Sequence, residues 1–180
     1  MEPSLISEVI RCANFAAVKH KDQRRKDQEE TPYINHPIGV AYILTEEAGV
    51  TDLHVIQGAL LHDTVEDTDT SFQEIEQEFG PEVAGIVREV TDDKDLPKHA
   101  RKAAQIEHAP HSSKKAKLVK LADKLYNLRD LNRQGPVGWS AERVTEYFEW
   151  SAKVVNGLRG TSKPLEDKLD ELFRERNIST

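Results

Sequence analysis

Cysteine is almost missing from this 180-residue sequence, where Cys12 is the only example. A single thiol excludes an internal disulfide and is typical of proteins that work in a reducing compartment. Cys12 stands close to Ala13 and Ala16 within a predicted helix over residues 4–20. We therefore interpret it as part of the core and not as a nucleophile.

Long apolar runs and an excess of positive charge are also missing. No segment approaches the roughly 20 apolar residues that a membrane-spanning helix needs, and the first residues lack the basic flank and apolar stretch of a signal peptide. We therefore expect no membrane association and a cytoplasmic location. The net charge of −7 argues against a nucleic-acid partner, because nucleic-acid-binding domains are usually basic.

Strand-like alternation of apolar and polar residues is the third absence. Apolar residues instead recur at helical spacing along almost the whole chain, most regularly at Leu118, Leu121, Leu125 and Leu128 of a predicted helix over residues 114–131. Another predicted helix covers 98–109. The intervening breaks are short and give no sign of a domain boundary. We predict an all-α fold, with residues 1–180 forming a single helical bundle of about eight to ten helices around a metal site.

The most unusual segment is His62-Asp63-Thr64-Val65-Glu66-Asp67, which follows the apolar run Ala59-Leu60-Leu61. If the helix continued, His62 would stack on Glu66 and Asp63 on Asp67, and the carboxylates would repel one another. Such breaks of local rules are expected at functional sites. A divalent cation would remove the conflict, whereas the simpler alternative is a solvated, acidic helix end.

Two other segments offer ligands for the same ion. His36 stands just before Pro37, which we predict to be the first residue of a helix, and Asp123 lies beside the apolar stripe of the helix over 114–131. Taken alone, His36 is more typical of a cap or surface group, and Asp123 of a solvated side chain. With the central His-Asp pair they form a nitrogen and oxygen donor set, which suits manganese, iron or zinc better than calcium.

This donor set indicates metal-assisted hydrolysis of a phosphate ester. A metal ion lowers the pKa of a coordinated water, and Glu66 and Asp67 could orient or deprotonate that water. The basic residues around Arg25 and Lys98 could hold a polyanion. On charge alone, however, the basic run at residues 19–26 is slightly more typical of a solvated helix end and loop.

The ordered set His36, His62-Asp63 and Asp123 resembles the H…HD…D signature of the HD-domain phosphohydrolases. The surrounding segments are more specific, and they resemble the hydrolase domain of the Rel/Spo guanosine tetraphosphate enzymes, above all the short, stand-alone animal SpoT homologues. The resemblance covers nearly the whole chain. Its segments are Arg25-Lys26, Pro32-Tyr33-Ile34-Asn35-His36-Pro37, Ala59–Thr68 and Lys120–Arg129.

The resemblance implies an enzyme that removes the 3′-diphosphate of a phosphorylated purine nucleotide, guanosine 3′,5′-bis(diphosphate), and gives GDP and pyrophosphate. It implies one manganese ion per chain, with iron or zinc as alternatives. The implied metal ligands are His36, His62, Asp63 and Asp123, and the implied water-activating pair is Glu66 and Asp67. The implied nucleotide contacts are Arg25, Lys26 and Asn127, with Lys98, Arg101, Arg143 and Tyr147 as weaker candidates.

Other functions stay open at this stage. The stand-alone form has been linked to removal of the 2′-phosphate of NADPH, which would use the same pocket. A nucleotide-binding module without catalysis would typically have lost a ligand or one acid of the Glu66-Asp67 pair, yet every one of these positions is filled. A helical interaction scaffold would not need the clustered ionisable groups. Tyr126 stands where the long bacterial enzymes commonly have histidine, and the oligomeric state is left open.

Overall fold

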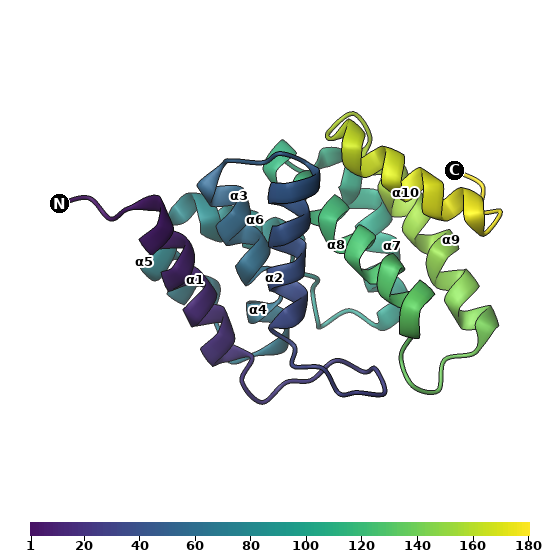
Figure 1. Cartoon of the computed structure of the whole chain (residues 1–180), viewed down its shortest axis with the longest axis horizontal. Helices are drawn as coiled ribbons and strands as arrows, with labels where there is room; N and C mark the ends of the chain where they lie inside the picture. The colour runs from purple at the N-terminus through teal and green to yellow at the C-terminus, as the bar shows by residue number, and fades with distance from the viewer.

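The computed structural model describes residues 1–180, and it confirms the predicted all-α class with ten α-helices (Figure 1). Extended pairing is limited to an isolated bridge between Arg24 and Pro32. None of the helices is long and apolar enough to cross a membrane. The elements are α1 (Leu5–Lys19), α2 (Asn35–Tyr42), the π-helical turn η1 (Ile43–Glu47), α3 (Leu53–Leu61), α4 (Thr64–Asp67), α5 (Phe72–Phe79), α6 (Pro81–Val90), α7 (Lys98–His108), the 3-10 turn η2 (Ala109–His111), α8 (Lys114–Gln134), α9 (Ala141–Leu158) and α10 (Lys163–Glu175).

Side-chain caps determine where many of the helices begin. A cap oxygen accepts a hydrogen bond from an amide of the first turn that would otherwise lack a partner. The capping residues are Ser4 of α1, Asp52 of α3, Ser71 of α5, Ser113 of α8 and Ser140 of α9. The predicted helices over residues 4–20 and 98–109 agree with α1 and α7 to within a residue at each end, whereas α8 continues beyond the predicted end to Gln134.

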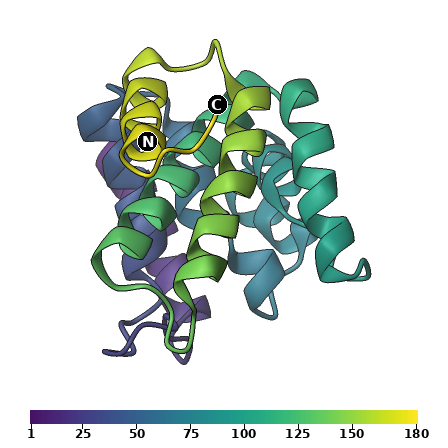
Figure 2. The same cartoon turned by 90° about the vertical axis from the view of Figure 1, so that its right-hand side faces the viewer.

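Helix α3 lies at the centre of the fold, in contact with α1, α2, α6 and α8. Every residue from Val55 to Leu61 is buried, as expected for a helix that is apolar all round. Figure 1 shows α2 and α8 side by side in the middle of the molecule, and Figure 2 shows α9 and α10 along the outside of its C-terminal half. Burial of 30 apolar side chains in one cluster holds these helices together.

The structure corrects one predicted helix start and resolves the conflict in the central segment. Helix α2 begins at Asn35, so His36 lies inside its first turn and not before it, and the predicted start at Pro37 is wrong. Helix α3 does not continue through the acidic segment, because it ends at Leu61 and the short α4 begins at Thr64. The chain therefore turns at the His-Asp pair, and its carboxylates do not stack along one continuous helix.

Candidate active site

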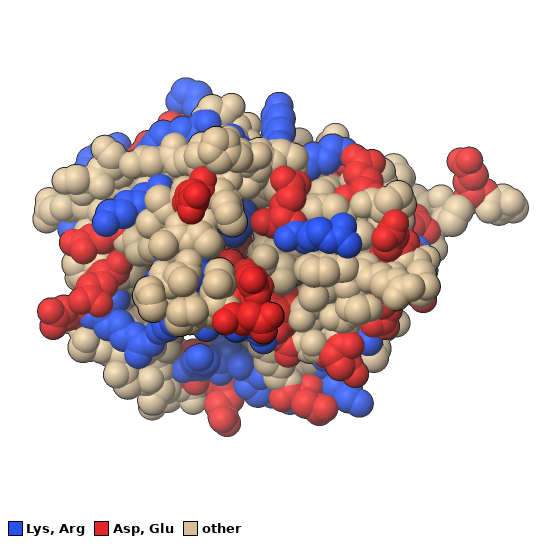
Figure 3. Space-filling model, turned by 180° about the vertical axis from the view of Figure 1, so that it is seen from behind, with Lys and Arg blue, Asp and Glu red and all other residues tan.

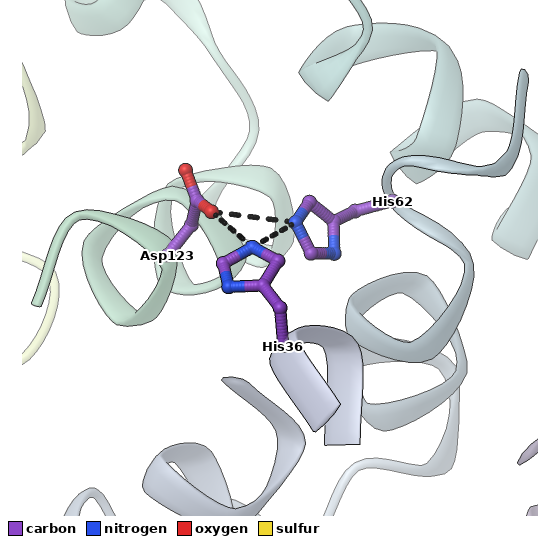
Figure 4. A group of neighbouring side chains, drawn as sticks. All are labelled: His36, His62 and Asp123. Carbon is purple, nitrogen blue, oxygen red and sulfur yellow. Dashed lines mark hydrogen bonds and ion pairs between the residues drawn. The ribbon is translucent and has the colours of Figure 1, made fainter. Parts of the chain in front are cut away.

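Three side chains from separate parts of the chain point toward one another (Figure 4). His36 comes from the first turn of α2, His62 from the end of α3, and Asp123 from the middle of α8. His36 Nε2 lies 3.0 Å from Asp123 Oδ1 and 3.2 Å from His62 Nε2. His62 Nε2 lies 3.3 Å from the same Asp123 oxygen. The three donor atoms therefore surround one small space.

A second carboxylate, that of Asp63, completes this group. Asp63 Oδ2 lies 3.0 Å from His62 Nε2 and 3.5 Å from His36 Nε2. Both histidines are almost completely buried, with 1% exposure for His36 and 4% for His62. Two buried imidazole nitrogens facing each other between two carboxylates form a strong site for a cation, since such ligands bind metal in the neutral imidazole and ionised carboxylate forms.

The hydrogen bond that His62 makes outside the ligand group fits a bound divalent cation. His62 Nδ1 lies 2.6 Å from the carbonyl oxygen of Ala59, so Nδ1 donates a hydrogen bond there and Nε2 is the ring atom that faces Asp123 and would bind the cation. The donor set comprises two imidazole nitrogens and two carboxylates, and it contains no thiolate. This chemistry is typical of catalytic sites for manganese, iron or zinc, and it differs from that of structural zinc sites.

The two carboxylates of this group are ionised. Burial opposes the charge on Asp123, but hydrogen bonds with His36 and His62 outweigh it and hold the pKa of Asp123 well below its usual value. Burial likewise opposes the charge on Asp63, yet the neighbouring His62 lowers the pKa of that carboxyl. Burial raises the pKa of Tyr33, whose hydroxyl stays protonated and donates a hydrogen bond of 2.5 Å to Asp63 Oδ2.

The acids Glu66 and Asp67 follow on α4, and their carboxylate oxygens lie within 4.8 Å of each other and of Asp63. Burial, followed by the charge of Asp63, raises the pKa of Glu66 to about 7. The backbone N–H of Asp92 donates a hydrogen bond of 3.0 Å to Glu66 Oε1 and orients this carboxyl. Burial also raises the pKa of Asp67, which accepts a hydrogen bond from Gln23. Carboxyl groups with a pKa near 7 are well suited to exchange protons with water.

The ligand group lines a hollow of about 180 Å³, which we call the metal hollow. A second hollow of about 160 Å³, the nucleotide-side hollow, shares Asn127 and Tyr147 with it and adds Arg25, Lys26 and Trp139. Four of the predicted substrate contacts therefore line space next to the ligand group. Figure 3 shows a face of this acidic protein on which Lys and Arg side chains gather at a hollow, with acidic side chains beside it.

The remaining predicted contacts lie farther from the ligand group. Lys98 is exposed at the start of α7 and lines neither of these hollows. Arg143 lies over the Trp139 ring, with its guanidinium carbon 4.1 Å from the ring centroid. Arg101 lines a third hollow. Arg25 already forms an ion pair with Asp130 at 2.9 Å, so its charge is partly neutralised.

Three residues of the site were missed in the sequence analysis. Tyr33 contacts Asp63, Trp139 lines the nucleotide-side hollow, and Lys124 is buried with Nζ 3.9 Å from Asp123 Oδ2. Burial lowers the pKa of Lys124 to about 8. A lysine beside the apolar pattern of α8 and a tyrosine in the turn before α2 both have ordinary explanations on a surface, so only the three-dimensional contacts reveal their role.

Comparisons with known proteins agree with this site. An HD domain family model matches residues 12–147. The guanosine-3′,5′-bis(diphosphate) 3′-pyrophosphohydrolase of Xenopus tropicalis is 66% identical over 171 residues, which cover 95% of this chain and 96% of that protein. The human enzyme of the same description is 64% identical over 173 residues, covering 96% and 97%. A solved structure, described as a metazoan ortholog of SpoT that hydrolyzes ppGpp, superposes with a TM-score of 0.95 at 56% identity and covers 99% of both chains.

Proposed function

Because this chain belongs to the HD-domain family, among the guanosine-3′,5′-bis(diphosphate) 3′-pyrophosphohydrolases, we propose that it hydrolyses the 3′-diphosphate of guanosine 3′,5′-bis(diphosphate). The products are GDP and pyrophosphate. The observation that carries this proposal is the meeting of His36, His62, Asp63 and Asp123 in one hollow, next to an acidic pair and a basic, aromatic hollow. A binding module or scaffold would need no such combination.

The four ligands would hold one divalent cation, for which we propose manganese on the basis of the donor set and the family resemblance. Such an ion acts as a Lewis acid and makes water a nucleophile near neutral pH. Tyr33 orients Asp63 through its hydrogen bond, and the Ala59 carbonyl orients His62. Both contacts fix the ligands before the substrate arrives.

Glu66 is the residue that we assign to proton transfer. Its carboxylate accepts a proton from water, whose oxygen bonds to the phosphorus attached to the ribose 3′ oxygen. The bond between that phosphorus and the 3′ oxygen breaks, and the 3′ oxygen takes up a proton. The raised pKa of about 7 lets Glu66 accept a proton and release it again near neutral pH. Asp67 adds negative charge beside Glu66 and keeps the pair basic.

The nucleotide-side hollow supplies the contacts for the rest of the substrate. The ring centroids of Trp139 and Tyr147 lie 5.8 Å apart, and both rings offer faces on which a purine can stack. Arg25 and Lys26 bring positive charge for phosphate groups. Asn127 Nδ2 donates a hydrogen bond of 3.3 Å to Asp123 Oδ1, which links the nucleotide contacts directly to a metal ligand.

The test is a product assay on the purified protein with added manganese. We expect GDP and pyrophosphate in equal amounts from guanosine 3′,5′-bis(diphosphate), with loss of activity on chelation and recovery when manganese is restored. NADPH serves as the competing substrate, and orthophosphate release from it with higher kcat/KM would replace our assignment of the substrate. Nucleotide binding without release of any phosphate product would overturn the enzymatic proposal.

A further inference from the structure

A third hollow adjoins the metal hollow, and we call it the distal hollow. It has a volume of about 450 Å³ and lies between α6, α7 and the start of α8. It shares Asp92, Gln105 and Lys120 with the metal hollow. The nucleotide-side hollow shares a different pair with the metal hollow, Asn127 and Tyr147. The metal hollow therefore has two separate neighbours.

Helix α8 gives the order of the three hollows. Lys120 lines the distal and metal hollows, Asp123 is a ligand in the metal hollow, and Asn127 lines the metal and nucleotide-side hollows. At a rise of about 1.5 Å per residue, Lys120 and Asn127 are roughly 10 Å apart along the helix axis, with the ligand between them. A substrate with its nucleoside near Asn127 and its scissile phosphorus near Asp123 would direct its terminal phosphate toward Lys120.

The distal hollow is lined by three basic and three acidic side chains, and each acid already accepts a hydrogen bond within the protein. Arg88, Arg101 and Lys120 line it and take part in no ion pair. Two of its acids are already engaged by neutral donors. Glu89 accepts hydrogen bonds from the backbone and hydroxyl of the α8 cap, at 2.8 and 2.6 Å. Both oxygens of Asp92 accept from Gln105 Nε2, at 3.0 and 2.8 Å.

Arg101 also carries a buried donor without a partner. Its Nε is shielded from solvent and makes no hydrogen bond within the protein. A buried donor left unpaired costs about 1–3 kcal/mol. Arg101 lines the distal hollow, and guanidinium groups bind phosphate more strongly than neutral donors do. The distal hollow therefore offers the Arg101 guanidinium, two further cations and a boundary that it shares with the metal hollow.

We propose that the distal hollow is a subsite for the terminal phosphate of the substrate's 3′-diphosphate, and that it holds the pyrophosphate product after cleavage. Arg101 and Lys120 are its binding residues. The assignment rests on the proposed function, and it explains how the site distinguishes a 3′-diphosphate from a 3′-monophosphate. A monophosphate would reach the ligand group but would leave the distal hollow without an anion.

The first experiment measures binding of pyrophosphate and GDP to the manganese-loaded protein by calorimetry, with metal content checked afterwards. In Lys120→Gln and Arg101→Gln we expect pyrophosphate to bind at least about tenfold more weakly, with GDP affinity and metal content unchanged. Lys114→Gln is the matched control, because Lys114 is on the same helix, is exposed and lies outside the distal hollow. Unchanged pyrophosphate affinity in both variants, with metal retained, would overturn the subsite.

The second experiment compares kcat/KM for guanosine 3′,5′-bis(diphosphate) with that for guanosine 5′-diphosphate 3′-monophosphate. The wild type should have the higher kcat/KM for the 3′-diphosphate. In both variants the ratio of the two kcat/KM values should fall about tenfold. A general loss of folded protein or of metal would lower both kcat/KM values and leave their ratio unchanged. An unaltered preference in active variants refutes the subsite but leaves the proposed function standing. Absence of turnover in the wild type refutes the proposed function, while the pyrophosphate titration still tests the subsite.

Discussion

The hydroxyl oxygen of Tyr33 lies 2.5 Å from Asp63 Oδ2 and donates a hydrogen bond to it. Tyr33 is itself held by ring contacts with His20 and His36, at centroid distances of 4.9 and 5.7 Å. Tyr33 therefore fixes the orientation of the Asp63 carboxylate within the ligand group. Partners of this kind set the geometry and the affinity of a metal site although they do not touch the ion.

Replacing Tyr33 with phenylalanine should weaken manganese binding while keeping the ring contacts. Loss of one partner of a metal ligand lowers affinity by about 10–100-fold. Tyr42→Phe is the matched control, since the Tyr42 side chain is 62% exposed and makes no contact with the ligand group. Metal titration of both variants by calorimetry is the measurement. Equal affinities for the two variants would show that Tyr33 does not orient Asp63.

Two helical glycines should respond in opposite directions to alanine. A Cβ on Gly39 of α2 would collide with the ring of Tyr126, whereas nothing lies near a Cβ on Gly85 of α6. Tyr126 packs edge-on against His36, with ring centroids 4.7 Å apart, so Gly39→Ala should disturb this proposed metal ligand as well as the fold. We expect Gly85→Ala to raise the free energy of unfolding by about 0.5–1 kcal/mol. Gly39→Ala should lower it and also weaken metal binding.

Urea unfolding of both variants, with and without manganese, separates these effects. A stabilising Gly39→Ala substitution would contradict the close packing of Tyr126 on α2. A neutral or destabilising Gly85→Ala substitution would contradict the open space that the structure shows above α6.

Glu47 should contribute stability that depends on pH. Arg129 donates to both of its oxygens, at 2.7 and 2.8 Å, and Lys168 lies 2.8 Å away, which together lower the pKa of Glu47 from 4.5 to about 2. A lowered pKa means that the stabilisation is fully present above pH 4.5 and is lost as the pH falls from 4.5 toward 2. Glu47→Gln should therefore cost about 2 kcal/mol at neutral pH.

Urea unfolding between pH 7 and pH 3 tests this pH window. The difference between wild type and Glu47→Gln should be constant down to about pH 5 and should fall to less than half at about pH 3. Glu46→Gln is the control, because Glu46 is exposed and forms no ion pair, and it should change stability by less than about 0.5 kcal/mol. A difference that grows on acidification would contradict the ion-pair assignment.

Much of the helical framework could be predicted from the sequence because it depends on local features. Three predicted caps are confirmed, because each residue stands directly before an apolar pattern with helical spacing. They are Ser4, Ser71 and Ser140. The start of α2 could not be predicted in the same way. Pro37 is compatible with the first position of a helix, but α2 begins two residues earlier. The turn before it is held by hydrogen bonds from Tyr33 to the Gln23 carbonyl and to the Asp63 carboxylate.

The components of the candidate site were visible in the sequence, but their arrangement was not. The residue types His36, His62, Asp63 and Asp123 indicate a metal site because the chemistry needs such donors. The turn after Leu61 separates the acids from a continuous helix, and side-chain hydrogen bonds from His62 and Thr64 to backbone carbonyls hold it. The apolar helical pattern does not indicate these bonds. The distal hollow is formed by α6, α7 and α8 together, so no local pattern around Arg101 or Lys120 reveals it.

The most direct test measures metal content and pyrophosphate release on the same samples of wild type, Asp123→Ala and Glu66→Gln. The wild type should hold one manganese ion per chain and release pyrophosphate from guanosine 3′,5′-bis(diphosphate). Asp123→Ala should lose both metal and turnover. Glu66→Gln should keep the metal and lose about 10²–10⁴-fold in kcat, as expected for a residue that transfers a proton. Full turnover in Asp123→Ala, or an unchanged kcat in Glu66→Gln, would contradict the account.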